Sequence, residues 1–414
     1  MELGQIRKWL RGWRLVGVAL GTLIVIGSLV WWRVGESFYW RWLFESPNAG
    51  RCQTHLSRPL LKRSLELGTG FLLTHQKPAG NFDYEYDWRE KALSSDDQET
   101  RQAGALWGLS MMYQAQKTPQ VAAAVERGLA FFDKHSRLQG EVRCTVYPHS
   151  SAGRVGTIAL VALSYIEYLR VAELGDAQRA SYEKRLGEYL QMLVKSVHPS
   201  GLWYSEYDVK TCVASEDPSS YSDGEALLAL VKAAKYLNKK ELLPTIMAAA
   251  AAGKRLNIDR ALAQEPDSDV TKGYYQWSSM AFYELATSDF PDSQRYGAVV
   301  LYLADWVIDV HKILTRTRNT GYAFEGIVHA YALAKQSKDS VRQAKYGCVI
   351  DIGMERLLSW QVGGPAPNRY TAVAAADDKQ ALGGIQNAAF DAPLRVDVTQ
   401  HQMHATQLAL EYVY

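Results

Sequence analysis

The sequence predicts an all-α protein in which six helical hairpins close into an (α/α)6 toroid, preceded by one transmembrane helix. From about residue 60 onward, apolar residues recur with the 3.6-residue period of helices, without the alternation typical of strands. The expected helices fall into pairs, and the second helix of each pair is apolar around most of its circumference. Loops that enter these second helices are long, whereas loops that leave them are short.

The N-terminal segment is predicted to anchor the chain in a membrane. Residues 15–32 contain no charge, and these 18 residues approach the roughly 20 that a spanning helix needs. Basic residues dominate before this run, which places residues 1–14 in the cytoplasm. No small-residue cleavage site follows, so an uncleaved anchor is favoured over a signal peptide. We expect residues 33–59 to form an interfacial linker and residues 60–414 to lie in the periplasm or otherwise outside the inner (cytoplasmic) membrane.

The charge balance argues against a nucleic-acid partner. The formal net charge is +2, but six of the 46 basic residues and two of the 44 acidic residues lie in the first 41 positions. The remaining 373 residues therefore carry a slight negative charge and offer no concentrated basic face. The four cysteines (Cys52, Cys144, Cys212 and Cys348) show no CxxC spacing, and both disulfides and buried free thiols remain possible.

Each predicted pair combines an outer helix with a charged stripe and an inner helix such as "GTIALVALSYIEYLRVA". The six pairs are 61–76 with 102–114, 119–135 with 156–172, 178–196 with 224–237, 240–256 with 277–286, 293–313 with 323–336, and 340–361 with 399–412. A single hairpin cannot bury its apolar face, so neighbouring hairpins must stack and the ring must close. The long loops then bring all six inner-helix N-termini to one mouth, where free N–H groups and positive helix ends converge.

Three segments carry a resemblance to known proteins. "YSDGEALLAL", "TGYAFEGIVHAYALA" and "GGIQNAAFDAPLRVDVTQHQMHATQLAL" are similar to parts of bacterial toroids related to the glucuronyl C5-epimerase C-terminal domain. The pattern over residues 60–414 resembles the six-hairpin glycosidase-like superfamily of carbohydrate-active enzymes. This resemblance implies a toroid and a glycan substrate. It does not specify the reaction, because toroids also host lyases, terpenoid cyclases, prenyltransferases and peptide cyclases.

Acidic and imidazole side chains near the predicted mouth are the candidate catalytic residues. They are Asp83, Glu206, Asp223, Glu225, Glu325, Asp397 and His401. Glu225 and Glu325 occupy positions of the buried type, where a carboxylate needs a polar cavity or a partner. His329 lies four residues after Glu325, so a cavity-facing pair is one prediction and a core histidine is the other. Asp223 is also a natural helix N-cap, and Asp397 with Arg395 also suits a salt bridge that fixes a loop.

Aromatic and basic residues around these acids are the candidate substrate-binding groups, because flat rings suit sugar faces and basic groups suit acidic sugars. They are Tyr84, Trp88, Arg154, Trp203, Tyr204, Tyr221, Tyr275, Tyr322, Arg395 and His404. Further basic residues in the mouth loops are Arg143, His149, Arg316 and Arg318. His401 and His404 are adjacent at i, i+3, but no third metal ligand follows at a known spacing, so neither a metal nor a cofactor is predicted.

Two classes of function remain open on the sequence. One is a membrane-anchored enzyme that acts on an envelope or exopolysaccharide glycan. Its reaction is hydrolysis by two carboxyl groups, or epimerisation or elimination at a uronic acid with Tyr204 or His401 as base and Arg154 or Arg395 as cation. The other is a non-catalytic toroid that binds a polymer or a protein partner in an envelope synthesis or export complex. A subunit that handles an anionic peptide polymer is a weaker third possibility.

Overall fold

The computed structural model describes residues 56–373 and 377–414. The predicted cytoplasmic tail, membrane anchor and most of the linker lie outside the described residues. Within the described ranges, no helix is both long and apolar enough to cross a membrane. Residues 54–414 form one compact unit.

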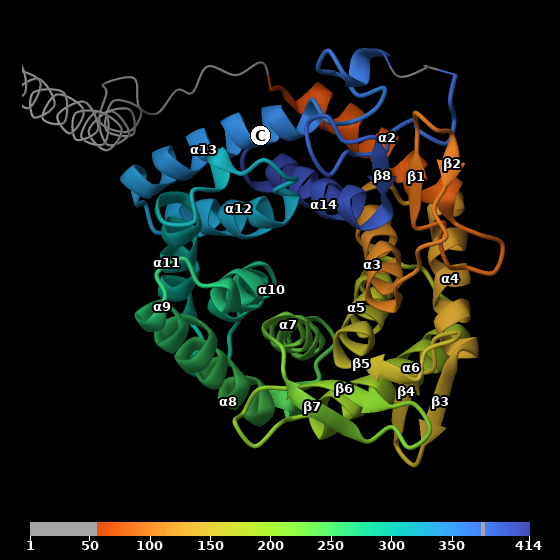
Figure 1. The fold of residues 1–414 in the computed structure, drawn as a ribbon. Helices are drawn as coiled ribbons and strands as arrows, with labels where there is room; N and C mark the ends of the chain where they lie inside the picture. Colours follow the sequence, from red (N-terminus) through yellow and green to blue (C-terminus); the bar gives the residue numbers. More distant parts are fainter. Residues whose placement is uncertain (1–55, 374–376) are drawn as a thin grey trace, which may run out of the picture. The chain divides into compact units, whose positions relative to one another are not determined.

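Twelve main helices form two concentric rings, as predicted (Figure 1). The outer helices are α2 (Arg58–His75), α4 (Pro119–Lys134), α6 (Asp176–Lys195), α8 (Leu243–Gly253), α11 (Tyr296–Asp309) and α13 (Ser340–Leu358). The inner helices are α3 (Glu99–Gln116), α5 (Val155–Val171), α7 (Ser220–Tyr236), α10 (Asp269–Ala286), α12 (Gly321–Gln336) and α14 (Val396–Tyr412).

The inner ring is closed, because each inner helix packs against the next and α14 packs against both α12 and α3. The closing contact is tight. A Cβ at Gly108 of α3 would lie 2.5 Å from the Gln400 Cγ on α14, so only glycine fits there. Inner helices are buried on nearly all sides, as α5 shows, with every residue from Val155 to Leu169 buried. The outer helix α4 instead buries one face and begins at Thr118, whose side chain accepts a hydrogen bond from the Val121 N–H.

The largest boundary errors fall in the third and fourth hairpins. Helix α7 begins at Ser220 instead of 224, and α10 begins at Asp269 instead of 277. The chain reaches α10 after α8 has continued through a π-helical segment (Lys254–Arg260) into α9 (Ala261–Gln264). The predicted 20-residue loop before α10 is therefore wrong, because Ser268 caps a helix that starts well before the apolar run.

The expectation of a chain without strands is also wrong. Eight short strands lie in the long loops: β1 (Glu85–Asp87), β2 (Ala92–Leu93), β3 (Ser136–Gln139), β4 (Val142–Thr145), β5 (Ala152–Arg154), β6 (Tyr204–Asp208), β7 (Ala214–Pro218) and β8 (Pro393–Arg395). They form antiparallel sheets in the orders β2-β1-β8, β3-β4 and β5-β6-β7. Strands of two to five residues show too little alternation to be detected in the sequence. They brace the mouth, since β1–β8 pairing ties the first long loop to the start of α14. Three 3-10 turns complete the structure, at Lys240–Leu242, Ile313–Thr315 and Thr371–Val373.

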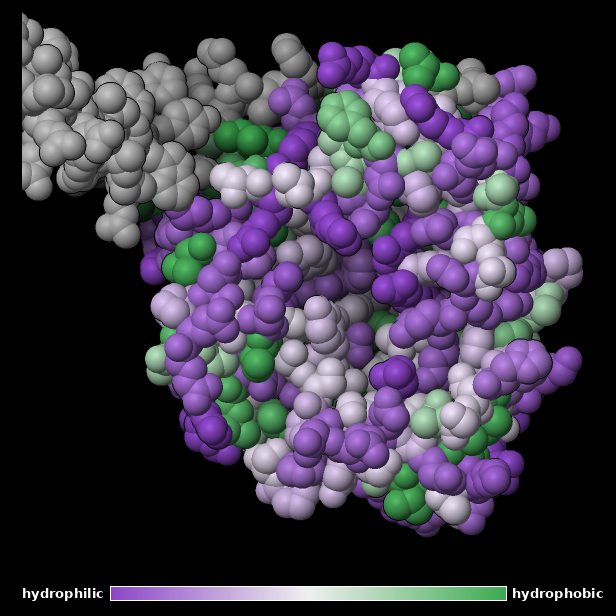
Figure 2. All heavy atoms as spheres, in the orientation of Figure 1, coloured by the Kyte–Doolittle hydropathy of each residue, from purple (hydrophilic) through white to green (hydrophobic). Residues whose placement is uncertain are grey.

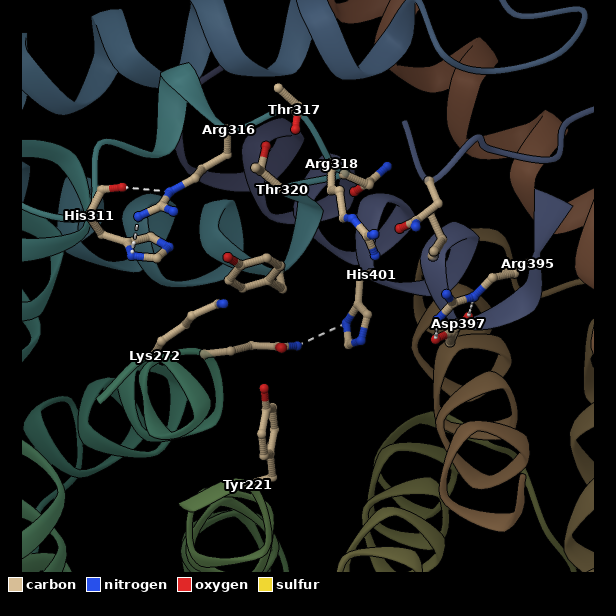
Figure 3. A pocket seen from close by; sticks show the side chains of 15 residues that line it. Tyr221, Lys272, His311, Arg316, Thr317, Arg318, Thr320, Arg395, Asp397 and His401 are labelled. Atoms are coloured by element: carbon tan, nitrogen blue, oxygen red, sulfur yellow. Dashed lines mark hydrogen bonds and ion pairs between the residues drawn. The ribbon is translucent and has the colours of Figure 1, made fainter. Parts of the chain in front are cut away.

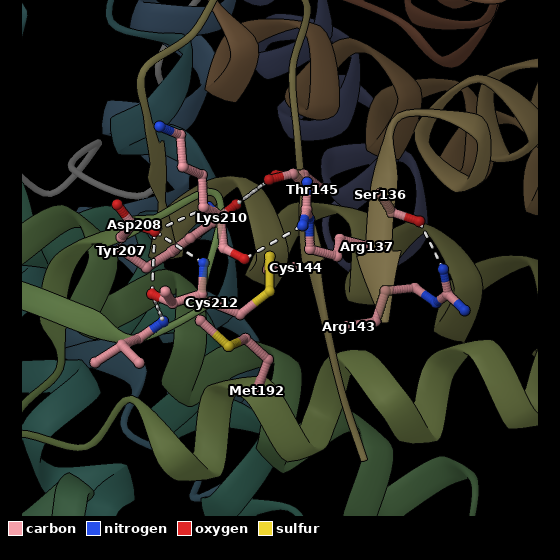
Figure 4. Close-up of a disulfide and its surroundings, with 12 residues drawn as sticks. Ser136, Arg137, Arg143, Cys144, Thr145, Met192, Tyr207, Asp208, Lys210 and Cys212 are labelled. Carbon is pink, nitrogen blue, oxygen red and sulfur yellow. Dashed lines mark hydrogen bonds between the residues drawn. A yellow bond between two sulfur atoms is a disulfide. The ribbon is translucent and has the colours of Figure 1, made fainter. Parts of the chain in front are cut away.

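A disulfide joins two of these loops. Cys144 of β4 is bonded to Cys212 in the turn between β6 and β7, with Cα atoms 5.8 Å apart (Figure 4). Both cysteines are buried. No cysteine in the described part of the chain is free, so the disulfide alternative is the correct one there. Disulfides persist mainly in oxidising compartments.

Candidate active site

A cavity of about 490 Å³ opens at the end of the ring where the inner helices begin. Figure 2 shows this face with a central hollow surrounded mainly by hydrophilic residues. Its walls come from α7, α10, α12, α14 and the segments that precede α12 and α14. The lining residues are Tyr221, Lys272, Gln276, His311, Arg316, Thr317, Arg318, Asn319, Thr320, Tyr322, Asn387, Arg395, Asp397, Val398 and His401. The predicted cleft, with contributions from at least four repeats, is confirmed.

The start of α14 delivers His401 to the floor of this cavity (Figure 3). Behind it lies Glu325 of α12, whose side chain is fully buried. The Glu325 Oε1 is 2.9 Å from the His404 Nδ1 and 3.4 Å from the His401 Nδ1. One buried carboxylate oxygen therefore faces two imidazoles on consecutive turns of the same helix. This contact explains why the start of the last helix is rich in titratable groups.

Gln276 of α10 completes the support of His401. Its amide nitrogen lies 2.9 Å from the His401 Nδ1 and also donates to the second Glu325 oxygen. The Nε2 atom of His401 makes no hydrogen bond within the described residues. Because the His401 side chain retains 23 % of its accessible surface, Nε2 is the ring nitrogen available to a bound molecule. The imidazole is thus held at one nitrogen and free at the other.

The protonation states of this cluster follow from its charges. Burial alone would raise the pKa of Glu325, but the neighbouring His401 and the hydrogen bonds from both imidazoles lower it below its usual range. For His401, burial lowers the pKa and the Glu325 carboxylate outweighs it, so the pKa is raised above 6.5. Glu225 of α7 also acts on His401 through its charge, and burial raises the pKa of Glu225 itself to about 8. Glu225 can therefore change protonation near neutral pH, and His401 holds its proton more strongly than a free imidazole does.

A second cluster of polar side chains, centred on Asp397, borders the cavity. Arg395 donates to both oxygens of Asp397, with the Nε to Oδ1 distance at 3.0 Å, so the predicted salt bridge is present. Arg101 of α3 lies 3.5 Å from the same carboxylate and donates to the Tyr84 hydroxyl. Burial raises the pKa of Tyr84 to about 12, and the Asp397 charge adds to this effect. Tyr84 therefore stays protonated and reaches the site through Arg101.

Positive potential also comes from the backbone at the mouth. Four of the six inner helices, α5, α7, α12 and α14, begin without a side-chain cap hydrogen bond. Their first N–H groups are left for other partners, and each helix start adds positive dipole charge. Among the cavity-lining residues, Asp397 is the one carboxylate. The site is therefore cationic.

Several predicted site residues lie in the protein core instead. The Trp203 indole donates to the Leu193 carbonyl, and the Tyr275 hydroxyl donates to the Ala323 carbonyl. Asp223 is not an N-cap of its own helix, because its oxygens accept from the Trp203 N–H and the Asn257 amide, each at 2.8 Å. These three side chains fix the third and fourth hairpins. Their expected position at the cavity is wrong.

Other candidates lie on the rim, outside the cavity. Asp83 pairs with Lys77 at 3.1 Å, and Arg154 pairs with Glu206 at 3.1 Å across the β5–β6 edge. Trp88 packs edge-on against Tyr370, and Tyr204 packs edge-on against His198. The structure thus gathers Tyr221, Tyr322, Arg395, Asp397 and His401 directly at the cavity, with Glu325, His404, Glu225 and Tyr84 behind or beside it.

The proposed Glu325–His329 pair is not formed. The His329 Nδ1 contacts the Glu325 backbone oxygen at 2.6 Å, and its ring packs against Tyr283 toward the opposite end of the ring. The core-histidine alternative is therefore the correct one for His329. His404 of α14 makes the side-chain contact with Glu325 that had been expected of His329.

Sequence reasoning missed Lys272, Gln276 and His311. The first two lie one turn apart on α10, in the segment that was expected to be a loop. A helix-start signal was present, since Ser268 precedes the acidic residue Asp269 in the first turn. No comparable signal marks His311, which reaches the site through the segment after α11. Within residues 56–373 and 377–414, no cluster of three or more His, Cys, Asp or Glu side chains is arranged to hold a metal ion.

Comparison with solved structures identifies the fold. A sugar epimerase from a ruminal bacterium superposes with a TM-score of 0.61 at 11% identity, covering 87% of this chain and 100% of that one. Cellobiose 2-epimerase of Bacillus thermoamylovorans gives 0.58 at 12% identity, covering 85% and 98%. An α-mannanase of Bacteroides thetaiotaomicron gives 0.55 at 11% identity, covering 86% and 95%. No protein-family profile and no curated protein sequence matches this chain. The described residues 56–373 and 377–414 therefore have an (α/α)6 toroid fold, as the resemblance implied.

Proposed function

We propose that the protein is a carbohydrate-active enzyme that transfers a proton to or from a sugar carbon. One observation carries this proposal: the free Nε2 of His401 faces a cavity while its Nδ1 is held against buried Glu325. A cavity of 490 Å³ falls within the usual range for small-molecule sites. The solved toroids with similar folds include sugar epimerases, which supports the choice of substrate class.

His401 is the proposed catalytic acid and base. The Glu325 carboxylate raises the pKa of His401 above its ordinary value, and an imidazole held in this way can accept and release a proton at a bound sugar. Glu325 and His404 are positioning residues, because they hold the ring and its charge without reaching the cavity. Epimerisation, isomerisation and β-elimination all begin with this kind of proton transfer.

Hydrolysis is less well supported by the geometry. It needs two carboxyl groups on either side of the scissile bond, one protonated and one ionised. Asp397 is the one carboxyl group among the cavity-lining residues, and it is ion-paired with Arg395 and Arg101. Glu225 and Glu325 are buried behind the wall. This arrangement favours proton transfer at carbon over cleavage by a carboxyl pair.

We further propose that the enzyme is anchored in the cytoplasmic membrane and acts on an envelope or exported glycan outside it. The uncharged run of residues 15–32 supports the anchor. The Cys144–Cys212 disulfide supports an oxidising location for the main domain.

A test uses the full-length protein in detergent, in deuterated water, with neutral and uronate oligosaccharides. Three products are followed: deuterium at a sugar carbon, unsaturated uronate, and new reducing ends. We expect deuterium or unsaturated product, lost in His401→Gln and kept in His198→Gln, which removes a rim histidine. New reducing ends alone would show hydrolysis and contradict proton transfer at carbon. Tight binding without any product would favour the alternative of a polymer-binding or partner-binding toroid.

A further inference from the structure

The cavity holds more positive charge than its own carboxylate can neutralise. Four Lys or Arg side chains line it, namely Lys272, Arg316, Arg318 and Arg395, against Asp397 alone. Charges of one sign around one cavity repel each other and attract a bound anion. The pairing of each cation therefore shows which of them is left for a ligand.

Two of the four cations are already engaged. Arg395 is bound through two nitrogens to Asp397. Arg316 donates to Asp267 at 2.8 Å and to the His311 carbonyl at 2.8 Å. Both guanidinium groups hold loops in place, and neither has its full charge available.

The other two cations are open. Lys272 has one ion-pair partner in the described residues, Asp269 at 3.6 Å, and that carboxylate is 94 % exposed, so water and salt screen the pair. The Arg318 side chain makes no hydrogen bond or ion pair with any residue that the structure describes. Figure 3 shows its guanidinium reaching into the cavity on the His401 side, while Lys272 enters from α10.

Arg318 is nevertheless presented from a fixed backbone. Its main chain forms a β-bridge with Ala388, and the next residue, Asn319, donates its N–H to the Asn387 carbonyl at 2.6 Å. The Asn319 amide also donates to Gln402 of α14 at 3.1 Å. The segment before α12 is therefore tied to the same helix that carries His401. Because the main chain is already ordered, only the Arg318 side chain loses conformational freedom when it binds an anion.

We propose that Arg318, assisted by Lys272, is a carboxylate-binding subsite, and that the substrate is consequently a uronate-containing glycan. This inference rests on the proposed function and deepens it. The planar guanidinium donates two parallel hydrogen bonds to a carboxylate. A sugar carboxylate held there places the carbon next to it in the cavity that His401 shares, and neutralising the carboxylate eases removal of the adjacent proton. Tyr221 and Tyr322 line the same cavity and offer ring faces to the sugar.

The experiment measures binding calorimetrically with the full-length protein and oligomers of galacturonate, glucuronate and mannuronate, each beside its methyl ester. The ester has the same shape without the charge. We expect at least one acid to bind about 10- to 100-fold more tightly than its ester, as for a charge-assisted hydrogen bond. Arg318→Gln should abolish that difference, Arg318→Lys should retain part of it, and higher salt should weaken acid binding in the wild type.

Arg255→Gln is the matched control, because Arg255 is also an exposed arginine. It lies on the π-helical segment of the outer ring, distant in sequence from Arg318. It should bind acid and ester as the wild type does. Equal binding of every acid and its ester, or full acid preference in Arg318→Gln, would overturn the subsite. Turnover without acid preference would reject the subsite and leave the proposed function standing. Acid preference without turnover would support the subsite and reject the proposed function.

Discussion

The two ends of the inner ring use the same six helices but treat charge in different ways. At the end where the helices begin, the 490 Å³ cavity holds His401 and Arg318, which has no ion-pair partner among the described residues. At the end where they finish, a smaller cavity of about 140 Å³ is lined by Glu167, Lys232, Glu284 and their neighbours. The first end leaves charge available to a bound molecule. The second end neutralises its charges internally.

The pairing at the second end is extensive. Lys232 contacts Glu167 and lies 3.8 Å from Glu284, while Lys235 lies 2.7 Å from Glu284. Arg170 pairs with Glu167 at 2.7 Å, and the Tyr236 hydroxyl donates to Glu284. Cations at helix C-termini also offset the negative helix ends. This network links the C-terminal halves of α5, α7 and α10.

The carboxyl groups of the two ends consequently shift in opposite directions. Burial alone would raise the pKa of Glu284, but Lys232 and Lys235 outweigh it and lower the pKa to about 2. Glu225, toward the cavity end, has no such partner, and burial raises its pKa to about 8. A buried carboxyl group stays ionised where cations pair with it, and it can change protonation near neutral pH where burial dominates.

The largest expected effect is on catalysis at the cavity end. Glu325→Gln keeps the side-chain shape but removes the charge that holds His401, so kcat should fall by about 10²- to 10⁴-fold, the range typical of acid–base catalysis. Glu284→Gln, at the other end, should leave kcat of the folded protein within about threefold. Steady-state rates of both variants give the comparison. Similar losses of kcat in the two would contradict the separation of roles.

The next effect is on stability at the paired end. Lys232→Met retains most of the side-chain volume but leaves Glu167 and Glu284 with fewer cations. Its free energy of unfolding should fall by about 3–5 kcal/mol, as for other broken buried ion pairs. Lys254→Met removes the exposed ion pair with Asp259 and should cost at most about 1 kcal/mol. Denaturant unfolding of both variants decides the point, and equal losses would show that burial of the network is unimportant.

The loops of the cavity end depend on a covalent link. Replacing both cysteines, as Cys144→Ser with Cys212→Ser, should lower the free energy of unfolding by about 2–4 kcal/mol, because the disulfide closes a long loop in the unfolded chain. Thermal unfolding with and without reductant measures this. Reductant should lower the stability of the wild type more than that of the double variant. Equal losses in the two proteins would argue against a structural role for this bond.

The last effect is on pH dependence, and at any one pH step it is the smallest. Glu225 ionises near pH 4.5 when unfolded and near pH 8 when folded, so its contribution to stability falls as pH rises between these values. Glu225→Gln should gain stability relative to wild type by up to about 1.4 kcal/mol per pH unit from pH 5 to 8. Glu284 behaves oppositely, since its contribution is lost as pH falls from 4.5 toward 2. Melting temperatures of Glu225→Gln, Glu284→Gln and the wild type across pH test both expectations. Parallel pH curves for the two variants would contradict the opposite pKa shifts of the two carboxyl groups.

Helical periodicity and loop length were sufficient to predict the ring. The inner helices are apolar on all sides, and such helices can be buried only if neighbours surround them, as α5 is. The convergence of helix starts on one mouth followed from the long loops. The same reasoning correctly brought His401, Asp397, Arg395, Tyr221 and Tyr322 to the cavity.

The errors have a common physical origin. Aromatic and acidic residues in a long loop suit a sugar site and a loop core equally well, and the two uses differ only in which backbone groups lie nearby. The Asp223 side chain accepts a hydrogen bond from the Trp203 N–H, 20 residues away in the chain, which no local pattern reveals. His329 and His404 have similar local sequence contexts, but only His404 faces Glu325, because the pairing depends on how α12 packs against α14.

The most direct test of the account is the rate at which solvent deuterium enters a sugar carbon of a uronate oligosaccharide. The full-length wild-type protein should incorporate deuterium at one carbon, and any new reducing ends should be matched by unsaturated uronate. His401→Gln should lower that rate by at least about 100-fold, whereas His198→Gln should not change it. An equal rate in His401→Gln and wild type would show that His401 is not the proton-transferring group.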